Sequence, residues 1–160
     1  MSENKPSDFG KAVPENVLAN LKVLIVASRF NEKHVDHLLA RCVEKLTQAG
    51  LKEHQIVIKR VPGANEIPAA IDFVLNKNHH CKAAIALGTV IAGETPHHEI
   101  IAHATAGALQ RIALDWRVPV INGIIVTNNE AQADARVFGE QDRGTEFADA
   151  ALEMITLFNS

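Results

Sequence analysis

Short apolar runs alternate with amphipathic stretches along most of the chain, from Leu21 to the C-terminus. The run Lys22–Ala27 is rich in β-branched residues and stays apolar after its first position, which is typical of a strand buried on both faces. Three further strands are predicted at 55–61, 83–90 and 118–126.

Between the strands, apolar residues recur at intervals of three or four positions, as on the buried face of a helix. After the first strand this series runs from Val35 to Leu46, and Gly50 is a natural stop. Other helices are predicted near 67–74, 98–114, 131–137 and 145–157. The alternation predicts a flavodoxin-like, three-layer α/β/α sandwich, in which helices cover both faces of a four-stranded parallel sheet.

The first 20 residues lack this periodicity. They contain charges and two prolines but no apolar segment of the signal-peptide type. We therefore predict a polar N-terminal extension over 1–20, ordered only against a partner, and a single domain over 21–160. Because no apolar run is long enough to span a bilayer, we expect a soluble, cytoplasmic protein without a membrane partner.

Unusual polar segments follow each predicted strand, at 28–31, 61–68, 88–98 and 127–129. Ligands of open α/β sheets bind outside the carboxyl ends of the strands. We therefore expect the four segments to meet at one edge of the sheet and to form one site.

The third segment, 88–98, contains the residues best suited to anion binding and proton transfer. Gly93 allows close backbone approach or a positive φ, and Thr95-Pro96 has the form of a helix N-cap followed by proline. Free N–H groups at a helix start bind anions such as phosphate, and His97 there is suited to proton transfer near neutral pH. From this motif alone, an ordinary turn with a surface histidine is the favoured interpretation.

Three other residues are candidates for the same site. Phe30 lies in a polar loop and is suited either to stacking on a planar heterocycle or to covering the core. Glu66 follows a Pro-Gly turn and is suited to accepting hydrogen bonds, although a lone carboxylate is more often solvated. Arg136 is a candidate phosphate ligand, with a plain surface arginine as the alternative.

Composition further limits the ligands and cofactors that the chain is expected to bind. Sixteen Lys and Arg against nineteen Asp and Glu give a net charge of -3, which excludes an electrostatic nucleic-acid binder. Cys42 and Cys81 lack CxxC spacing and are predicted to be small core residues. The eight histidines form no HExxH motif, so a metal site is disfavoured, and no glycine-rich nucleotide motif is present.

Five segments together resemble the lumazine synthase family, in its order and spacing: SRFN at 28–31, VPGANEIP at 61–68, LGTVIAGETPHHEI at 87–100, VPVINGIIVTNNEAQADAR at 118–136 and AALEMI at 150–155. The resemblance implies a transferase of riboflavin biosynthesis that needs no metal or organic cofactor. It would condense 5-amino-6-(D-ribitylamino)uracil with 3,4-dihydroxy-2-butanone 4-phosphate to 6,7-dimethyl-8-ribityllumazine, releasing phosphate and water.

The resemblance also implies roles for individual residues. His97 would transfer protons, and Phe30 would stack on the pyrimidinedione ring. Further substrate contacts would come from Ala64, Asn65 and Glu66 to the ribityl chain, from backbone groups of Thr89, Val90 and Ile91 to the ring edge, and from Glu94, Thr95 and Arg136 to the butanone phosphate.

Several positions depart from the commonest pattern of the family. Asn122 replaces an aromatic that packs over the substrate ring, His98 replaces Phe or Tyr, and Ala92 replaces a frequent Arg. Arg143 replaces the Lys of an Asn-Lys-Gly segment, and the connection back to Arg136 is one residue shorter. We expect altered affinity and a retained reaction.

The family assembles as homopentamers, sometimes twelve of them in an icosahedral 60-mer. By this resemblance Asn122, Arg136 and Arg143 would face a site completed by the adjacent chain. Two alternatives remain: a flavin- or lumazine-binding protein without turnover, for which Asn122 and His98 are the best support, and a shell protein that has lost its site. The second is disfavoured because a shell alone has no need of Phe30, Glu66, His97 and Arg136.

Overall fold

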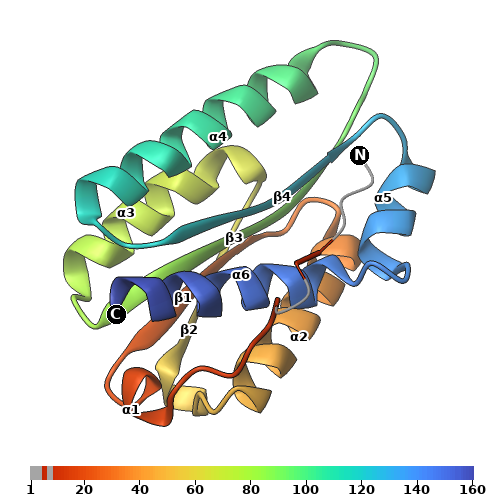
Figure 1. Cartoon of the computed structure of the whole chain (residues 1–160). Helices are drawn as coiled ribbons and strands as arrows, with labels where there is room; N and C mark the ends of the chain where they lie inside the picture. Colours follow the sequence, from red (N-terminus) through yellow and green to blue (C-terminus); the bar gives the residue numbers. More distant parts are fainter. Residues whose placement is uncertain (1–4, 7–8) are drawn as a thin grey trace.

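Strand β3 (Cys81–Ile91) runs through the middle of a single four-stranded sheet (Figure 1). The computed structural model describes residues 5–6 and 9–160. All neighbouring strands pair in parallel, in the order β2-β1-β3-β4. The other strands are β1 (Lys22–Ser28), β2 (Ile56–Val61) and β4 (Val120–Thr127). The parallel sheet predicted from the sequence is confirmed.

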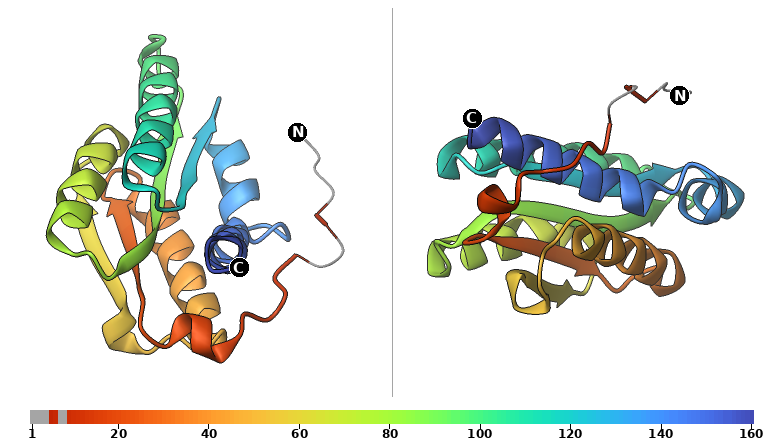
Figure 2. Two further views of the ribbon diagram at one scale, coloured as in Figure 1. Left: turned by 60° about the vertical axis from the view of Figure 1, so that its left-hand side comes forward. Right: turned by 60° about the horizontal axis from the view of Figure 1, so that its bottom comes forward.

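Helices cover both faces of this sheet, as Figure 2 shows. One face carries α3 (Ile67–Lys77) and α4 (His97–Trp116), and the other carries α2 (Glu32–Gln48), α5 (Glu130–Phe138) and α6 (Arg143–Phe158). Two short 3-10 turns, Glu53–Gln55 and Ala64–Glu66, precede β2 and α3. The predicted α/β/α sandwich is therefore confirmed. Among the described residues, none of the helices combines the length and apolar character that a membrane crossing requires.

The two helical layers enclose two separate apolar cores. Side chains of β1 alternate between them: Val23 and Ile25 pack in the core beneath α2 and α6, and Leu24 and Val26 pack beneath α3 and α4. All four are fully buried, and burying such a side chain contributes about 1.5–3 kcal/mol. The parallel register places the carboxyl ends of all four strands at one edge of the sheet.

The segment before β1 packs on its own chain where the structure describes it. A short helix, α1 (Glu15–Leu18), buries Leu18, and the Gln55 side chain donates to the carbonyl oxygens of Leu18 and Leu21 at 2.7 and 2.9 Å. The expected dependence on a partner is therefore wrong for α1, because the short apolar sequence there reaches the core. Residues 1–4 and 7–8 of the predicted extension lie outside the described residues, and the boundary at residue 20 stays a prediction.

The start of α4 differs from the predicted cap. Pro96, not Thr95, occupies the N-cap position, the helix begins at His97, and no side chain caps it. The amide of Glu99 donates to the Pro96 carbonyl at 3.0 Å, which sets the first turn one residue later than predicted. Gly93 has no positive φ, and a Cβ there would meet no atom of this chain within 4 Å. Gly50 does end α2 as predicted, with a φ of 114°.

Cys42 and Cys81 are both buried and free, which confirms them as core residues. Burial raises the pKa of the Cys42 thiol to about 12. Neither cysteine therefore offers a thiolate for chemistry near neutral pH.

Helix α2 contacts the start of α6 at a point of close approach. A Cβ on Gly144 would lie 2.7 Å from the Leu38 carbonyl oxygen and 2.8 Å from the Arg41 Cβ, so only glycine fits there. Beside it, Arg41 holds Asp142 with two hydrogen bonds, from Nε to Oδ1 at 3.1 Å and from Nη2 to Oδ2 at 2.6 Å. These contacts lower the pKa of Asp142 from 3.8 to about 2, with the Arg41 hydrogen bond as the largest cause.

The Asp142 contact predicts a specific pH dependence of stability. Because the carboxyl has a lower pKa in the folded than in the unfolded chain, ionised Asp142 stabilises the fold above pH 3.8, and this contribution is lost as pH falls towards 2. Asp142→Asn should therefore unfold more easily than the parent at neutral pH, and the gap should close in acid. Denaturant titrations of both proteins at matched concentration, from neutral pH downward, measure this. A gap that stays constant into acid would show that the pair contributes nothing in solution.

Candidate active site

Hydrogen bonds tie all four predicted segments together at the carboxyl edge of the sheet. The amides of Arg29 and Phe30 donate to the carbonyls of Val61 and Pro62, at 2.8 and 3.0 Å. The Asn31 side chain reaches the end of β3, where its Nδ2 donates to the Thr89 carbonyl at 2.7 Å. Just after β3, the Ala92 amide donates to the carbonyl of Thr127, the last residue of β4, at 2.9 Å. The expected convergence of the four segments at one edge of the sheet is therefore confirmed.

Phe30 and Glu66 flank Gly63. A Cβ on Gly63 would lie 3.3 Å from the Phe30 ring and 3.1 Å from Glu66 Oε2, so the missing side chain allows both groups to approach. The Gly63 amide donates to Glu66 Oε2 at 2.9 Å, which fixes the direction of the carboxylate. The Phe30 side chain is nevertheless 71% exposed. An exposed aromatic beside a fixed carboxylate offers a stacking surface and a hydrogen-bond acceptor for a polar ring compound.

Two buried hydroxyls lie at the same edge. Ser28 ends β1 and Thr89 lies near the end of β3, and neither side-chain oxygen has a hydrogen-bond partner among the described residues. A buried polar group without a partner costs about 1–3 kcal/mol, and such groups concentrate where a ligand or ordered water supplies the partner. Both hydroxyls therefore favour a binding function for this edge. Val90 and Ile91, the next residues of β3, are half-buried.

The start of α4 is open to solvent. Glu94, Thr95 and His97 are exposed, and the first amides of the helix have no side-chain cap. His98 is half-buried, with its Nδ1 3.3 Å from the Thr95 carbonyl oxygen. An uncapped helix start with a solvent-accessible imidazole can bind an anion and exchange protons with it.

Asn122, Arg136 and Arg143 line a second hollow, a cavity of about 230 Å³ that also includes Gln141 and Phe147. The Arg143 guanidinium lies over the Phe147 ring, 5.1 Å from its centroid, and its Nη1 contacts Glu146 at 3.3 Å. Its Nε is buried and has no hydrogen-bond partner among the residues that the structure describes. The structure thus brings together the three residues that the resemblance assigned to a shared site, and it adds Gln141, which sequence reasoning missed.

The two groups of site residues stay separate within one chain. Among the described residues, no hydrogen bond or ion pair joins the Phe30–Glu66 group or the start of α4 to the arginine cavity. The arginines lie on α5 and α6, on the opposite face of the sheet from α4 (Figure 2). Within one chain, the residues that the resemblance assigned to the substrates therefore form two separate groups.

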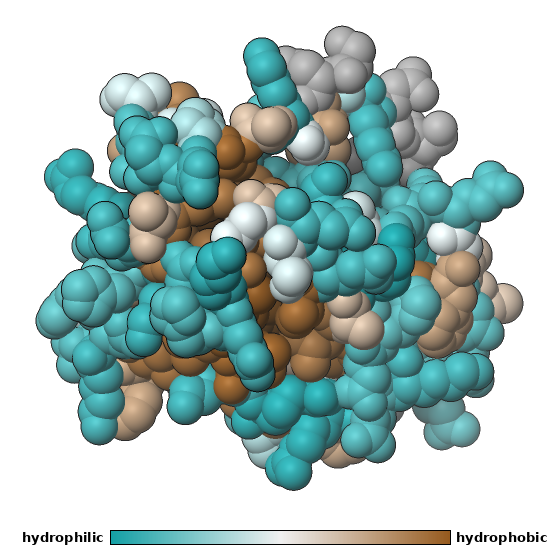
Figure 3. Space-filling model, turned by 90° about the horizontal axis from the view of Figure 1, so that it is seen from below, coloured by the Kyte–Doolittle hydropathy of each residue, from teal (hydrophilic) through white to brown (hydrophobic). Residues whose placement is uncertain are grey.

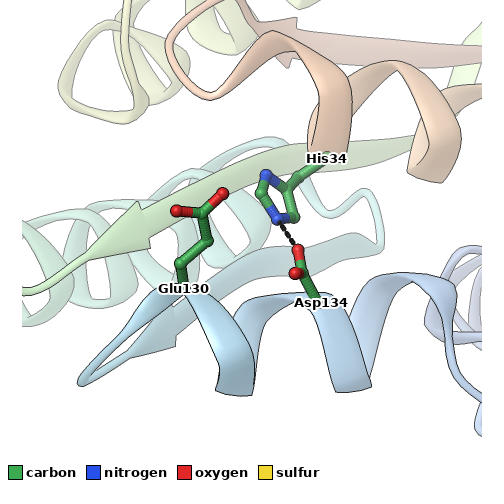
Figure 4. A group of neighbouring side chains, drawn as sticks. All are labelled: His34, Glu130 and Asp134. Atoms are coloured by element: carbon green, nitrogen blue, oxygen red, sulfur yellow. Dashed lines mark hydrogen bonds and ion pairs between the residues drawn. The ribbon is translucent and has the colours of Figure 1, made fainter.

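Figure 4 shows how α5 is fixed to the beginning of α2. The buried His34 ring and the Asp134 carboxylate form a hydrogen bond of 2.6 Å, with Glu130 nearby on α5. The possible metal-ligating atoms of these three residues lie within 4.8 Å of one another. Bonds of about 2.1 Å to one cation would separate neighbouring ligand atoms by about 3 Å, more than the observed contact between His34 and Asp134. This contact therefore ties two helices together and defines no cation site.

The comparisons with known proteins match nearly the whole chain. A family model described as 6,7-dimethyl-8-ribityllumazine synthase covers residues 20–159. The chain belongs to the lumazine synthase family. This membership confirms the resemblance of the five sequence segments.

Curated lumazine synthases from several bacteria align over most of their length. The protein from Coxiella burnetii (strain CbuG_Q212) is 39% identical over 140 residues, which are 87% of this chain and 92% of the relative. The protein from Nitrosomonas europaea is 42% identical, covering 83% of this chain and 79% of the relative. The protein from Methylibium petroleiphilum is 36% identical, covering 98% of this chain and 95% of the relative. The similarity thus extends across all four loops at the sheet edge.

Asn31 provides a test of how the loops are held. Its φ is 57°, a conformation that glycine adopts freely and alanine resists, and its side chain makes the bond to Thr89. Asn31→Gly should lower the free energy of unfolding by about 1 kcal/mol, the net worth of one hydrogen bond. Asn31→Ala should lower it by about 1 kcal/mol more through backbone strain. Denaturant unfolding of both variants measures the two contributions, and equal stabilities would contradict the strained conformation.

Proposed function

We propose that this chain is a 6,7-dimethyl-8-ribityllumazine synthase that joins 5-amino-6-(D-ribitylamino)uracil and 3,4-dihydroxy-2-butanone 4-phosphate, with release of phosphate and water. The observation that carries this proposal is the family match over residues 20–159. The local geometry supports it, because one sheet edge offers an aromatic surface, a fixed carboxylate and an open helix start. The reaction belongs to riboflavin biosynthesis and needs no cofactor.

The pyrimidinedione substrate fits the group around Phe30. Its ring would stack on the exposed Phe30 side chain, and its ribityl hydroxyls would donate to the Glu66 carboxylate beside Ala64 and Asn65. Backbone groups of Thr89, Val90 and Ile91 would hold the ring edge. The hydrogen bond from Asn31 to the Thr89 carbonyl holds this end of β3 in place beside the ring.

The phosphate of the second substrate fits the uncapped start of α4. Free amides and the helix dipole favour an anion there, and the Thr95 hydroxyl can donate to it. Glu94 would contribute its backbone N–H, because its carboxylate repels a phosphate. His97, exposed at the first position of the helix, would move protons during imine formation, phosphate elimination and ring closure.

Arg136 and Arg143 would complete the phosphate site from a neighbouring chain. Two cations in one small cavity form a strong anion site, yet no contact joins them to the helix start of their own chain within the part that the structure describes. We therefore infer a homo-oligomer in which each site combines the two halves, with the pentamer of the family as its unit. The pentamer, a possible 60-mer and the cytoplasmic location remain predictions.

Exposed apolar side chains support self-association. Ile100, Leu114 and Leu157 are each more than 60% exposed. The edge strand β2 also leaves Ile58 42% exposed, and Figure 3, which views the molecule from below, shows apolar surface between the polar side chains. Exposed apolar surface of this kind is typical of faces that another chain covers.

His97→Ala tests the catalytic assignment. If positioning of the substrates supplies most of the rate, the variant should turn over about 100-fold more slowly than the parent without losing all activity. Product formation is followed by the absorbance and fluorescence of the lumazine after mixing both substrates. His103→Ala, an exposed histidine further along α4, is the matched control and should keep the parental rate.

The outcomes separate the candidate functions. A parent protein that binds the product but forms none would be the non-catalytic binding protein, which the synthase names of the relatives do not favour. An unchanged rate in His97→Ala would remove the assigned proton transfer, and complete loss in a single-turnover assay would contradict the positioning argument.

Mixed oligomers test the shared site. His97→Ala damages one half of the site and Arg136→Ala the other, so oligomers containing only one variant have no intact site. When both chains are assembled together at random, about a quarter of the sites would combine two intact halves. Activity of the mixture should then exceed that of either variant by far. If it only averages the two, each site lies within one chain.

A further inference from the structure

Arg41 contacts the short connection that separates the two proposed phosphate-binding arginines. It lies on α2 and holds both carboxylate oxygens of Asp142 with its guanidinium fork, at 3.1 and 2.6 Å. A third donor, Nη1, contacts Glu44 one turn along the same helix at 2.7 Å. The Arg41 guanidinium is therefore held on α2 by Glu44 while it binds Asp142, in the segment between α5 and α6.

Asp142 has an unusual backbone conformation for a residue with a side chain. Its φ of 46° and ψ of 61° lie in the left-handed region, immediately before the first residue of α6. Its Oδ2 also accepts from the Thr145 hydroxyl at 2.7 Å, and its carbonyl accepts from the Glu146 amide at 3.2 Å. Contacts from two helices thus maintain a conformation that a residue with a Cβ disfavours.

The conformation of Asp142 decides the direction of Arg143. Arg143 is the next residue, and its guanidinium lies over Phe147 in the cavity shared with Arg136. Gly144 follows at a point where even a Cβ would clash with α2, so the backbone after Arg143 is closely packed. A change of φ and ψ at Asp142 would therefore swing the Arg143 side chain away from the cavity.

We propose that Arg41 is a positioning residue, which holds Asp142 in the left-handed conformation and thereby directs Arg143 into the cavity with Arg136. This inference rests on the proposed function, in which that cavity receives the substrate phosphate. A partly exposed ion pair usually adds little to stability, so orientation is the effect expected here. The lowered pKa of Asp142 keeps its carboxylate charged near neutral pH, where Arg41 can hold it.

The test is a comparison of steady-state kinetics of the assembled protein, with each substrate varied in turn. Arg41→Ala should raise the KM for the butanone phosphate about tenfold and leave the KM for the ribitylaminouracil nearly unchanged. Arg41→Lys should recover only part of the loss, because an ammonium group lacks the two-pronged geometry. Lys45→Ala is the matched control: Lys45 also joins α2 to α6, through Asp149 at 3.4 Å, and should not alter either KM.

A double variant shows whether Arg41 acts through Arg143. If it does, Arg41→Ala combined with Arg143→Ala should be no worse than Arg143→Ala alone. Additive losses, or an unchanged KM for the phosphate substrate in Arg41→Ala, would overturn the inference. Asp142→Asn tolerates the left-handed backbone and loses the charge, and it provides the same test if Arg41→Ala fails to fold.

A second readout separates this inference from the proposed function. If the parent protein forms no lumazine, the proposed function is wrong, and binding of inorganic phosphate is measured by calorimetry instead. Arg41→Ala and Arg143→Ala should then weaken phosphate binding to a similar extent. Parental phosphate affinity in Arg41→Ala would reject the positioning role whatever reaction the protein catalyses.

Discussion

The parallel pairing of β3 with both β1 and β4 is the constraint on which the rest of the molecule depends. Parallel strands need long crossovers, and the order β2-β1-β3-β4 makes the chain reverse its direction across the sheet after β2. Right-handed crossovers therefore place helices on both faces, and every strand ends at the same edge. That edge brings the loops that carry Phe30, Glu66 and His97 together from distant parts of the sequence. The direction of the strands thus decides where the candidate site residues meet, and the individual side chains decide what they can bind there.

Helix α2 connects this edge to the elements that carry the arginines. It begins directly after the Phe30 loop, its first turn holds α5 through His34 and Asp134, and its middle holds the start of α6 through Arg41. The two half-sites of a chain therefore share one rigid element. In the proposed oligomer, a displacement of α2 would reach two different active sites at once, because each half would serve a different neighbour.

Local patterns explain what the sequence could predict. Strands and helices follow from periodicity within a few residues, and the ends of α2 and β3 were found within a turn of their positions. The cap of α4 was placed one residue early, because Pro96 fits both the N-cap and the first helical position. The bond from Asn31 to Thr89 and the pair of Arg41 with Asp142 join residues far apart in the chain. Such pairs leave no local pattern, so only the folded structure reveals them.

The backbone conformation of Asp142 also constrains which substitutions this region can accept during evolution. For the stability of the fold, Arg41 can be replaced first, because Asp142 keeps its contact with Thr145 and the two carboxylates that lose a partner, Asp142 and Glu44, are partly exposed. Replacing Asp142 first by alanine or a β-branched residue places a Cβ in a left-handed conformation that nothing then compensates. Asparagine or glycine at this position avoids that barrier. Substitutions at these two sites should therefore accumulate in a preferred order across lineages, set by a single φ angle.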